Sequence, residues 1–184
     1  MFDKTIRIDT ERLTMRPFTL DDRDSIFNIM KDKEMYLYTP DEPWSGVESA
    51  EEFIKMVLWL YDMNHHNFRH FFAMTIKQSG EIIGFCGIGG IAYDRSKNEV
   101  FYSIGKDHWG KGYATEAAKA MLKYAFEELE LDNIIAAVHP ENIASNRVLQ
   151  KIGLKKVGVI SGLPEEHAFF NDEYLYSLDK EEIV

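Results

Sequence analysis

The stretch "HWGKGYATEAAKAMLKYAFEEL", His108 to Leu129, places two glycines, a lysine and a tyrosine directly before an alanine-rich segment. Apolar residues recur along it at helical spacing, namely Ala114, Ala117, Ala118, Met121, Leu122, Ala125 and Leu129. This pattern predicts a helix that begins near Gly112 and packs closely against a sheet through small side chains. The first backbone N–H groups of such a helix have no partners within it, so its N-terminus is a natural place for an anion.

The loop before this helix has the composition of a phosphate site. Gly110 and Gly112 lack the Cβ atoms that would hold a diphosphate away, and Lys111 can supply a counter-charge. A plain glycine turn before an amphipathic helix accounts for the loop equally well. A nucleotide P-loop is excluded because no Ser or Thr follows a Gly-Lys pair, and a dinucleotide fingerprint is disfavoured because "GKGYAT" ends in Thr.

Composition places the chain among single-domain globular proteins. Its 184 residues are 45% hydrophobic and 28% charged, which is enough to bury a core in one domain, residues 1–184. The formal net charge of −10 argues against nucleic acid as a partner, because binding along a phosphate backbone requires a basic face. The same charge either attracts cationic substrates and basic proteins or serves solubility alone.

The sequence predicts no membrane segment, no disulfide and no metal. The start, "MFDKTIRIDTERL", lacks the apolar stretch of a secretory signal, and the longest apolar run, "IIGFCGIGGIAY", is too short to span a bilayer. The single cysteine, Cys86, indicates a reducing, cytoplasmic setting and is expected to be a small buried hydrophobe. The histidines show no metal spacing supported by other ligands, and the pair His66 and His70 straddles a predicted change from helix to strand.

The order of predicted elements indicates an α+β fold. Turn residues separate segments whose apolar residues recur with the period of a strand or of a helix. Strands are predicted at 12–19 (an edge strand before a proline), 70–77, 82–93, 98–105, 133–139, 154–161 and 167–178; helices are predicted at 20–33, through 53–61, from Gly112 and at 142–153, with a loop at 34–47. An antiparallel run followed by β-α-β-α-β predicts one twisted mixed sheet of about six to seven strands with flanking helices.

Two longer motifs resemble a known superfamily. Together, "EVFYSIGKDHWGKGYATEA" (99–117) and "HPENIASNRVLQKIGLKKVG" (139–158) resemble the two signature regions of the GNAT acetyltransferases. With "ERLTMRPFT" (11–19), the chain is similar to the RimJ/RimL-type branch, which acetylates protein N-termini. The resemblance covers nearly the whole chain. It implies the GNAT fold, acetyl-CoA bound where two central parallel strands diverge, and direct acetyl transfer to a primary amine.

The resemblance assigns the cofactor site residue by residue. The loop that would hold the pyrophosphate of acetyl-CoA comprises Trp109, Gly110, Lys111, Gly112, Tyr113, Ala114 and Thr115, with Trp109 at a position where the superfamily has Gln or Arg. The strand end Tyr102, Ser103 and Ile104 would hold the pantetheine arm through backbone hydrogen bonds. Asn142 and Ser145 would lie beside that arm, and Asn142 is also a good N-cap for the helix that follows it.

The same resemblance implies chemical roles near the thioester. The N–H of Ile104 would stabilise the oxyanion that forms from the thioester carbonyl. Many members use a tyrosine seven residues after the asparagine to protonate the leaving thiolate, but Leu149 occupies this place. Ser145 lies four residues earlier on the same helical face and becomes the candidate proton donor. The alternative is that Ser145 is an ordinary small residue at a helix start.

The general base is a separate question. Some relatives carry a glutamate at the place of Ala137, whereas Glu99 matches a glutamate of the RimJ/RimL branch. Glu99 could accept a proton through water, or it could be a strand-end charge in solvent. An α-amine, with a pKa of about 8, needs less help than lysine, with a pKa of about 10.4. The lack of an obvious base therefore favours an α-amine acceptor.

The acceptor pocket is expected beside the 34–47 loop, the start of the second helix and a hairpin at 163–174. Four acidic residues in these segments would attract an ammonium group or a basic peptide, or would remain solvated surface: Asp41, Glu42, Glu165 and Glu166. Three aromatic residues would line the pocket or join the core: Tyr36, Tyr38 and Trp44.

The sequence leaves three functions open. The first is acetylation of the N-terminal α-amine of a protein, as in the ribosomal-protein branch. The second is acetylation of a small amine such as a polyamine, an amino acid or an aminoglycoside. The third is a non-catalytic sensor that binds acyl-CoA, which Leu149 in place of tyrosine keeps in consideration. A monomer and a homodimer fit the sequence equally.

Overall fold

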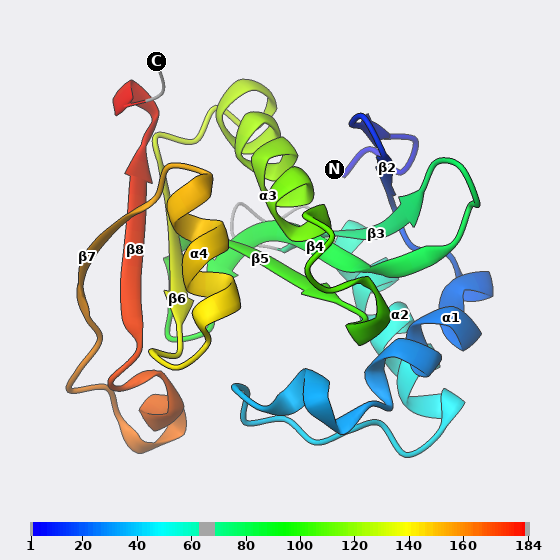
Figure 1. The fold of residues 1–184 in the computed structure, drawn as a ribbon, viewed down its shortest axis with the longest axis horizontal. Helices are drawn as coiled ribbons and strands as arrows, with labels where there is room; N and C mark the ends of the chain where they lie inside the picture. Colours follow the sequence, from blue (N-terminus) through cyan, green and yellow to red (C-terminus); the bar gives the residue numbers. More distant parts are fainter. Residues whose placement is uncertain (1, 63–68, 183–184) are drawn as a thin grey trace.

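The computed structural model describes residues 2–62 and 69–182 and contains a mixed sheet with helices packed on it (Figure 1). The strand order is β1-β2-β3-β4-β5-β6-β8-β7. The strands are β1 Ile8–Asp9, β2 Leu13–Arg16, β3 His70–Ile76, β4 Ile82–Ile91, β5 Asp94–Ile104, β6 Asn133–Val138, β7 Lys155–Val159 and β8 Tyr174–Asp179. The predicted α+β class with a mixed sheet is confirmed.

The described sheet has eight strands rather than the six to seven predicted. The additional strand is β1, whose two residues are too few to show a period in the sequence. β1 pairs with β2 in the register Ile8↔Met15 and Asp9↔Thr14. The prediction of an edge strand at 12–19 is therefore wrong, because β2 lies between β1 and β3.

The segment before β8 differs from the predicted hairpin. A 3-10 helix occupies Glu165–Phe170, and β8 begins at Tyr174 rather than near 167. Pro164 precedes this helix, and acidic side chains in its first turn suit the positive end of the helix dipole. Asp172, with a φ of +70°, then turns the chain into β8. The 163–174 segment is therefore a helical turn and not a pair of strands.

The two central strands, β5 and β6, run parallel, whereas the other neighbouring strands of the described sheet are antiparallel. Glu99 and Ile135 form the registered pair between β5 and β6. By contrast, β5 pairs with β4 along nearly its whole length. The carboxyl ends of β5 and β6 diverge beyond this single pair (Figure 1), as the resemblance to the superfamily implies.

Four α-helices flank the sheet in the described chain: α1 Arg23–Met30, α2 Val47–Asp62, α3 Tyr113–Lys123 and α4 Ile143–Lys151. α1 packs on α2, and α3 packs on β4, β5 and α4. The segment between α1 and α2 is a loop as predicted, apart from a 3-10 turn at Lys33–Tyr36. Within residues 2–62 and 69–182, no helix is long and apolar enough to cross a membrane.

α3 begins where the sequence predicts. Gly112 is its N-cap, in a left-handed conformation with a φ of +84°. Ala117, Ala118 and Met121 have no exposed surface, and the small size of the two alanines lets the helix pack closely on the strands. After α3 the chain widens into a π-helical turn at Tyr124–Glu128. The packing of this buried face determines where the N-terminus of α3 points.

Glycines in β4 allow a close approach of the neighbouring strands. A Cβ built on Gly84, which has a φ of +150°, would lie 2.0 Å from the carbonyl oxygen of Ser103 in β5. A Cβ on Gly87 would lie 2.1 Å from the carbonyl oxygen of His70 in β3. Both distances are far below van der Waals contact, so β4 can pair as it does only without side chains at these positions.

Gly84→Ala is expected to lower the free energy of unfolding by about 2–4 kcal/mol, because the new methyl group meets backbone atoms that cannot move aside. Gly158→Ala in β7 is the matched control, since a Cβ there would meet nothing within 4 Å. For the control we expect a change below about 0.5 kcal/mol. Urea unfolding measures both values, and equal stabilities would contradict the predicted clash.

Candidate active site

The C-terminal end of β5 directs a backbone N–H towards the divergence of β5 and β6. Gly105 N–H donates to the Ile83 carbonyl of β4 at 2.8 Å. Successive residues of a strand direct their backbone groups to opposite sides, so the N–H and carbonyl of Ile104 point away from β4. The indole Nε1 of Trp109 donates to that carbonyl at 2.6 Å, which agrees with this direction. The N–H of Ile104 therefore faces the side on which the two strands diverge.

The loop before α3 combines two glycines in left-handed conformations, with a φ of +72° at Gly110 and +84° at Gly112. Among the described residues no side chain caps α3, so the N–H groups of its first turn are left for another acceptor. A Cβ built on Gly110 would meet no atom within 4 Å, so the loop is open there. This cradle fits a diphosphate, because backbone donors and the helix dipole are directed at an open surface.

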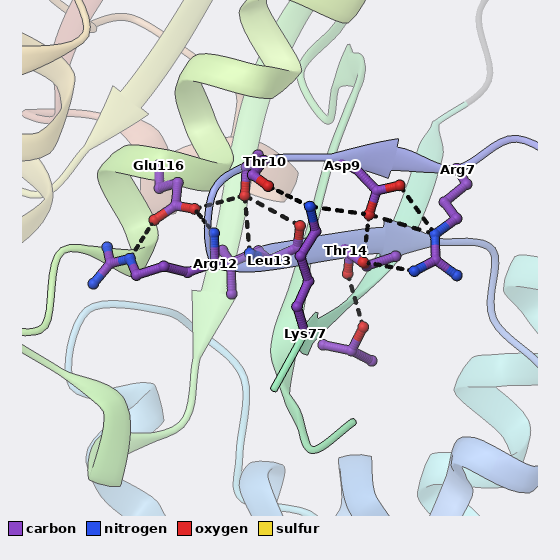
Figure 2. Close-up of polar contacts among 9 residues, drawn as sticks. Arg7, Asp9, Thr10, Arg12, Leu13, Thr14, Lys77 and Glu116 are labelled. Atoms are coloured by element: carbon purple, nitrogen blue, oxygen red, sulfur yellow. Dashed lines mark hydrogen bonds and ion pairs between the residues drawn. The ribbon is translucent and has the colours of Figure 1, made fainter. Parts of the chain in front are cut away.

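The turn between β1 and β2 contacts the first turn of α3 (Figure 2). Thr10 Oγ1 and the backbone N–H of Arg12 both donate to Oε1 of Glu116, at 2.6 and 2.7 Å. Arg12 Nε donates to Oε2 of Glu116 at 2.7 Å, and Arg12 Nη1 donates to the Lys111 carbonyl at 2.9 Å. Sequence reasoning missed these residues because Arg12 and Glu116 are 104 positions apart.

The start of α4 brings Asn142, Ser145 and Tyr102 together. Oδ1 of Asn142 accepts a hydrogen bond from the Ser145 N–H at 3.1 Å, so Asn142 is the N-cap of α4. The Tyr102 hydroxyl donates to the Ser145 carbonyl at 3.5 Å. Burial raises the pKa of Tyr102 to about 12, so its hydroxyl keeps its proton at neutral pH. Leu149, one turn after Ser145, is buried.

Asn146, which sequence reasoning also missed, fixes the loop before α4. Its Nδ2 donates to the carbonyl oxygens of His139 at 3.1 Å and Asn142 at 2.9 Å. Its Oδ1 accepts a hydrogen bond from the Tyr176 hydroxyl of β8 at 2.8 Å. Asn146 is buried, and these bonds satisfy its amide group. Because Asn146 follows Ser145 directly, this network also fixes the orientation of the first turn of α4.

Glu99 is a mostly buried carboxylate, so the alternative of a strand-end charge in solvent is wrong. Its side chain is 12% exposed and forms an ion pair with Arg69. Burial raises the pKa of Glu99, and the Arg69 guanidinium opposes this shift. Arg69 also donates from Nε to the Gly90 carbonyl at 3.0 Å and lies 4.8 Å from the ring centroid of Phe101. The ion pair therefore lies within a packed environment at the parallel strand pair.

A second carboxylate near Glu99, Glu173, was not predicted. Glu173 lies directly before β8 and is 4% exposed. Burial first, and then repulsion from Glu99, raise its pKa to about 7. Burial also raises the pKa of Tyr93 to about 12, with a contribution from both carboxylates. No local pattern marks Glu173 in the sequence, because its burial depends on how β8 joins the sheet.

The aromatic residues before α2 divide between two environments. The Tyr36 hydroxyl donates to the Met30 carbonyl at 2.7 Å, and both Tyr36 and Trp44 pack against the core. Tyr38 instead stacks on His139, with 5.3 Å between the ring centroids. Tyr38 therefore joins the loop before α2 to the end of β6, beside the start of α4.

The remaining sequence candidates are surface acids, a thiol and histidines. Asp41, Glu42, Glu165 and Glu166 are exposed. Cys86 is fully buried, and burial raises the pKa of its thiol. His65 and His66 lie outside the described residues, and with them the pair His66–His70. Within the described ranges, no group of three or more His, Cys, Asp or Glu side chains could hold a metal ion.

Comparison with known proteins identifies the class of this chain. The acetyltransferase (GNAT) domain family matches residues 12–155. The chain is 33% identical over 173 residues to "Uncharacterized N-acetyltransferase p20" of Bacillus licheniformis, covering 94% of this chain and 96% of that protein. Among solved structures, an acetyltransferase (GNAT family) from Bacillus anthracis has a TM-score of 0.80 and 27% identity, covering 96% of this chain and 100% of that chain. Mycobacterium smegmatis RimJ in complex with CoA-disulfide has a TM-score of 0.72 and 23% identity, covering 93% and 83%.

The fold and these matches define an acetyl-CoA-dependent N-acetyltransferase. The chain belongs to the GNAT acetyltransferase family. The resemblance drawn from the two sequence motifs is thereby confirmed, and RimJ is among the proteins that share its fold. The glycine loop, which fits a diphosphate on geometry alone, lies within the residues that match the family.

Glu173→Gln is expected to change stability in a pH-dependent way. The folded-state pKa of Glu173, about 7, lies above its ordinary value of 4.5. The wild type therefore loses stability as the pH rises through this interval, because the unfolded chain releases the proton first. At about pH 8 the variant is expected to be more stable than the wild type by about 1–2 kcal/mol, with a smaller difference at about pH 4.

Urea unfolding at both pH values measures the effect of Glu173→Gln, and Glu166→Gln is the matched control at an exposed glutamate. The control is expected to show no such pH dependence. A difference between Glu173→Gln and the wild type that does not vary with pH would contradict the buried ionisation.

Proposed function

We propose that this acetyltransferase acetylates the N-terminal α-amine of a protein, as ribosomal-protein acetyltransferases do. The observation that carries the proposal is that β5 and the segment that follows it contain three features that suit acetyl transfer. These are the backbone N–H of Ile104, the open glycine loop and the mostly buried carboxylate of Glu99. The first two would bind and polarise an acyl donor, and the third would act as a weak base.

Bound acetyl-CoA supplies an activated acetyl thioester. The loop from Trp109 to Thr115 would hold its diphosphate through backbone N–H groups and the Lys111 side chain. The end of β5, Tyr102 to Ile104, would hold the pantetheine arm as a strand-like partner, because β6 diverges from β5 there. Asn142 would lie beside this arm while it caps α4.

Ile104 is the proposed donor to the developing oxyanion. A preorganised donor of this kind is worth about 3–4 kcal/mol in comparable sites. Trp109 Nε1 holds the carbonyl of the same residue at 2.6 Å. The pairing of β5 with β4 fixes the other side of the strand, through the Gly105 N–H and the Ile83 carbonyl. The Ile104 N–H would therefore need little reorganisation when the reaction begins.

Ser145 is the proposed donor of the proton to the departing thiolate. It lies half-buried in the first turn of α4, where its own N–H is held by Asn142. The Tyr102 hydroxyl is a second protonated group beside Ser145, since it donates to the Ser145 carbonyl. Removing each hydroxyl separately distinguishes the two donors.

Glu99 is the proposed proton acceptor, acting through water. A carboxylate is a weak base towards an ammonium group, even where burial raises its pKa as it does for Glu99. An α-amine, with a pKa of about 8, is already partly neutral at pH 7, whereas a lysine side chain, with a pKa of about 10.4, is not. The site therefore suits an α-amine better than a lysine. The net charge of −10 would help to attract basic protein segments.

The proposal also covers the cellular compartment, the partners and the oligomeric state. The one cysteine, Cys86, is buried and free, which supports a reducing, cytoplasmic environment. The partners would be acetyl-CoA and the amine acceptor, with the protein acting as a monomer or a homodimer. The exposed acids Asp41 and Glu42 favour small polyamines as the second candidate acceptors.

Thiol release from acetyl-CoA tests the acceptor. The panel holds peptides with free N-termini, lysine peptides with blocked N-termini, polyamines and aminoglycosides. We expect release with the free N-termini only, and a kcat lowered by about 10²–10³-fold in Ser145→Ala with little change in KM. Tyr102→Phe is the matched variant and is expected to retain most activity. Because Cys86 is buried, it adds no background to a thiol reagent.

Other results of the thiol-release assay would contradict the proposed acceptor, the proposed catalysis or the proposed proton donor. Release with small amines alone would replace the protein acceptor by the second candidate. If no acceptor in the panel gives thiol release although the protein binds CoA, the result would support a sensor of acyl-CoA and contradict the proposed catalysis. A larger loss in Tyr102→Phe than in Ser145→Ala would move the role of proton donor to Tyr102.

Gly110→Asp tests whether the loop binds the diphosphate. Gly80 in the β3–β4 turn has the same φ of +72° and, like Gly110, open space around its built Cβ. Gly80→Asp is therefore a control that introduces the same residue with the same backbone strain. We expect Gly110→Asp to weaken CoA binding by about tenfold or more in calorimetry, because its carboxylate repels the diphosphate, and Gly80→Asp to leave the affinity unchanged. Equal affinities would show that the loop is only a helix cap.

A further inference from the structure

Arg12 lies in the turn of the hairpin that β1 and β2 form, and it contacts the glycine loop at several points. Its Nη1 donates to the Lys111 carbonyl at 2.9 Å, and its guanidinium lies 4.5 Å from the ring centroid of Tyr113. Its Nη2 would lie 3.4 Å from a Cβ built on Gly112. Arg12 thus spans the segment in which the chain turns into α3. The planar guanidinium group carries several N–H donors and can make these separate contacts at the same time, whereas a lysine ammonium group cannot.

Glu116 places a negative charge in the first turn of α3, at the helix end that is proposed to bind the diphosphate. Burial acts to raise its pKa, but hydrogen bonds from Thr10 and Arg12 outweigh burial and lower the pKa. Glu116 is therefore ionised at neutral pH. A carboxylate here stabilises the helix dipole, but it also repels a second anion at the same end. Arg12, with its Nε 2.7 Å from Glu116 Oε2, is the cation that compensates this charge.

The turn between β1 and β2 holds Arg12 in place (Figure 2). The N–H of Thr10 donates to the Leu13 carbonyl at 2.9 Å, and the N–H of Leu13 donates to Thr10 Oγ1 at 2.9 Å. Lys77 of the segment after β3 donates to the Thr10 carbonyl. Because the turn is closed by these bonds and Thr10 itself contacts Glu116, the Arg12 side chain starts from a fixed backbone.

We propose that Arg12 is a positioning residue for the diphosphate of coenzyme A. It fixes the loop at 110–113 and neutralises Glu116, so that the N-terminus of α3 attracts the diphosphate instead of repelling it. The inference rests on the proposed function, because it requires that the glycine loop binds the diphosphate of acetyl-CoA. Arg12 acts through Lys111 and Glu116, and it extends the cofactor site to a hairpin outside the two sequence motifs.

Calorimetric titration of the full chain with CoA tests this role. Arg12→Ala is expected to weaken CoA binding by about tenfold or more. Arg12→Lys is expected to weaken it by a smaller factor, because lysine keeps the positive charge but lacks the planar set of N–H donors of the guanidinium group. Arg7→Ala is the matched control. Arg7 belongs to the same hairpin but pairs with Asp9 and Thr14 at its other end (Figure 2). The control is expected to bind CoA like the wild type.

A double variant and a change of salt concentration test the effect of the Glu116 charge separately. In the double variant Arg12→Ala/Glu116→Gln the uncompensated carboxylate is gone, so the affinity for CoA is expected to recover by about threefold or more relative to Arg12→Ala. The ratio of affinities between wild type and Arg12→Ala is also expected to narrow between about 0.05 and 0.5 M salt, because salt screens the repulsion. A role in folding alone predicts neither effect.

The outcomes separate the inference from the proposed function. A wild-type protein that does not bind CoA would overturn the proposed function. Wild-type binding with unchanged affinity in Arg12→Ala would overturn the inference alone. So would a loss that Glu116→Gln does not reverse and that salt does not reduce. If circular dichroism shows Arg12→Ala to be unfolded, the role of Arg12 is tested with Arg12→Lys and Arg12→Lys/Glu116→Gln instead. If both of these variants bind CoA as tightly as the wild type, the inference is overturned.

Discussion

The divergence of β5 and β6 is the constraint on which the rest of the molecule depends. Because Glu99 and Ile135 form a single registered pair, the carboxyl end of β5 presents backbone groups that a neighbouring strand would otherwise take. An open edge inside a sheet needs support from the elements around it. The glycines of β4 provide this support on one side by letting β4 approach β5 closely, and Trp109 holds the Ile104 carbonyl at the open end. The proposed place for the cofactor therefore follows from interrupted strand pairing rather than from one special side chain.

Two ion pairs between distant segments fix charges at the start of α3 and within the sheet. Arg12 compensates Glu116 at the start of α3, and Arg69 compensates Glu99 within the sheet. In both pairs the arginine comes from an earlier segment and also contacts an aromatic ring, Tyr113 in one case and Phe101 in the other. Both carboxylates are mostly buried, so removing either arginine would leave a charge without compensation. The protein thus keeps two acids near the proposed cofactor site and compensates the charge of each with a guanidinium group.

The sequence determined the local features well and the distant contacts poorly. The helical period of small residues located α3, and the glycine at 112 marked its start, because both signals lie within one short window. β1 was missed because two residues carry no period, and the 3-10 helix at 165–170 was read as part of a hairpin because its apolar residues also suit a strand. Within the site, the Asn142 cap was found locally. The pairs Arg12–Glu116 and Arg69–Glu99 join residues 104 and 30 positions apart, and no pattern in a single sequence encodes such pairings.

The position of β8 has a consequence for how the protein is made. β8 follows the other described strands in the chain, yet it lies inside the sheet between β6 and β7. The run from β1 to β5 pairs in chain order, so it can assemble from neighbouring segments while synthesis continues. β7, by contrast, pairs with β8 and must wait until that strand has left the ribosome. The opening between β5 and β6 lies at the boundary of these two halves, and a nascent chain would therefore complete its proposed cofactor site only after β8 has been synthesised.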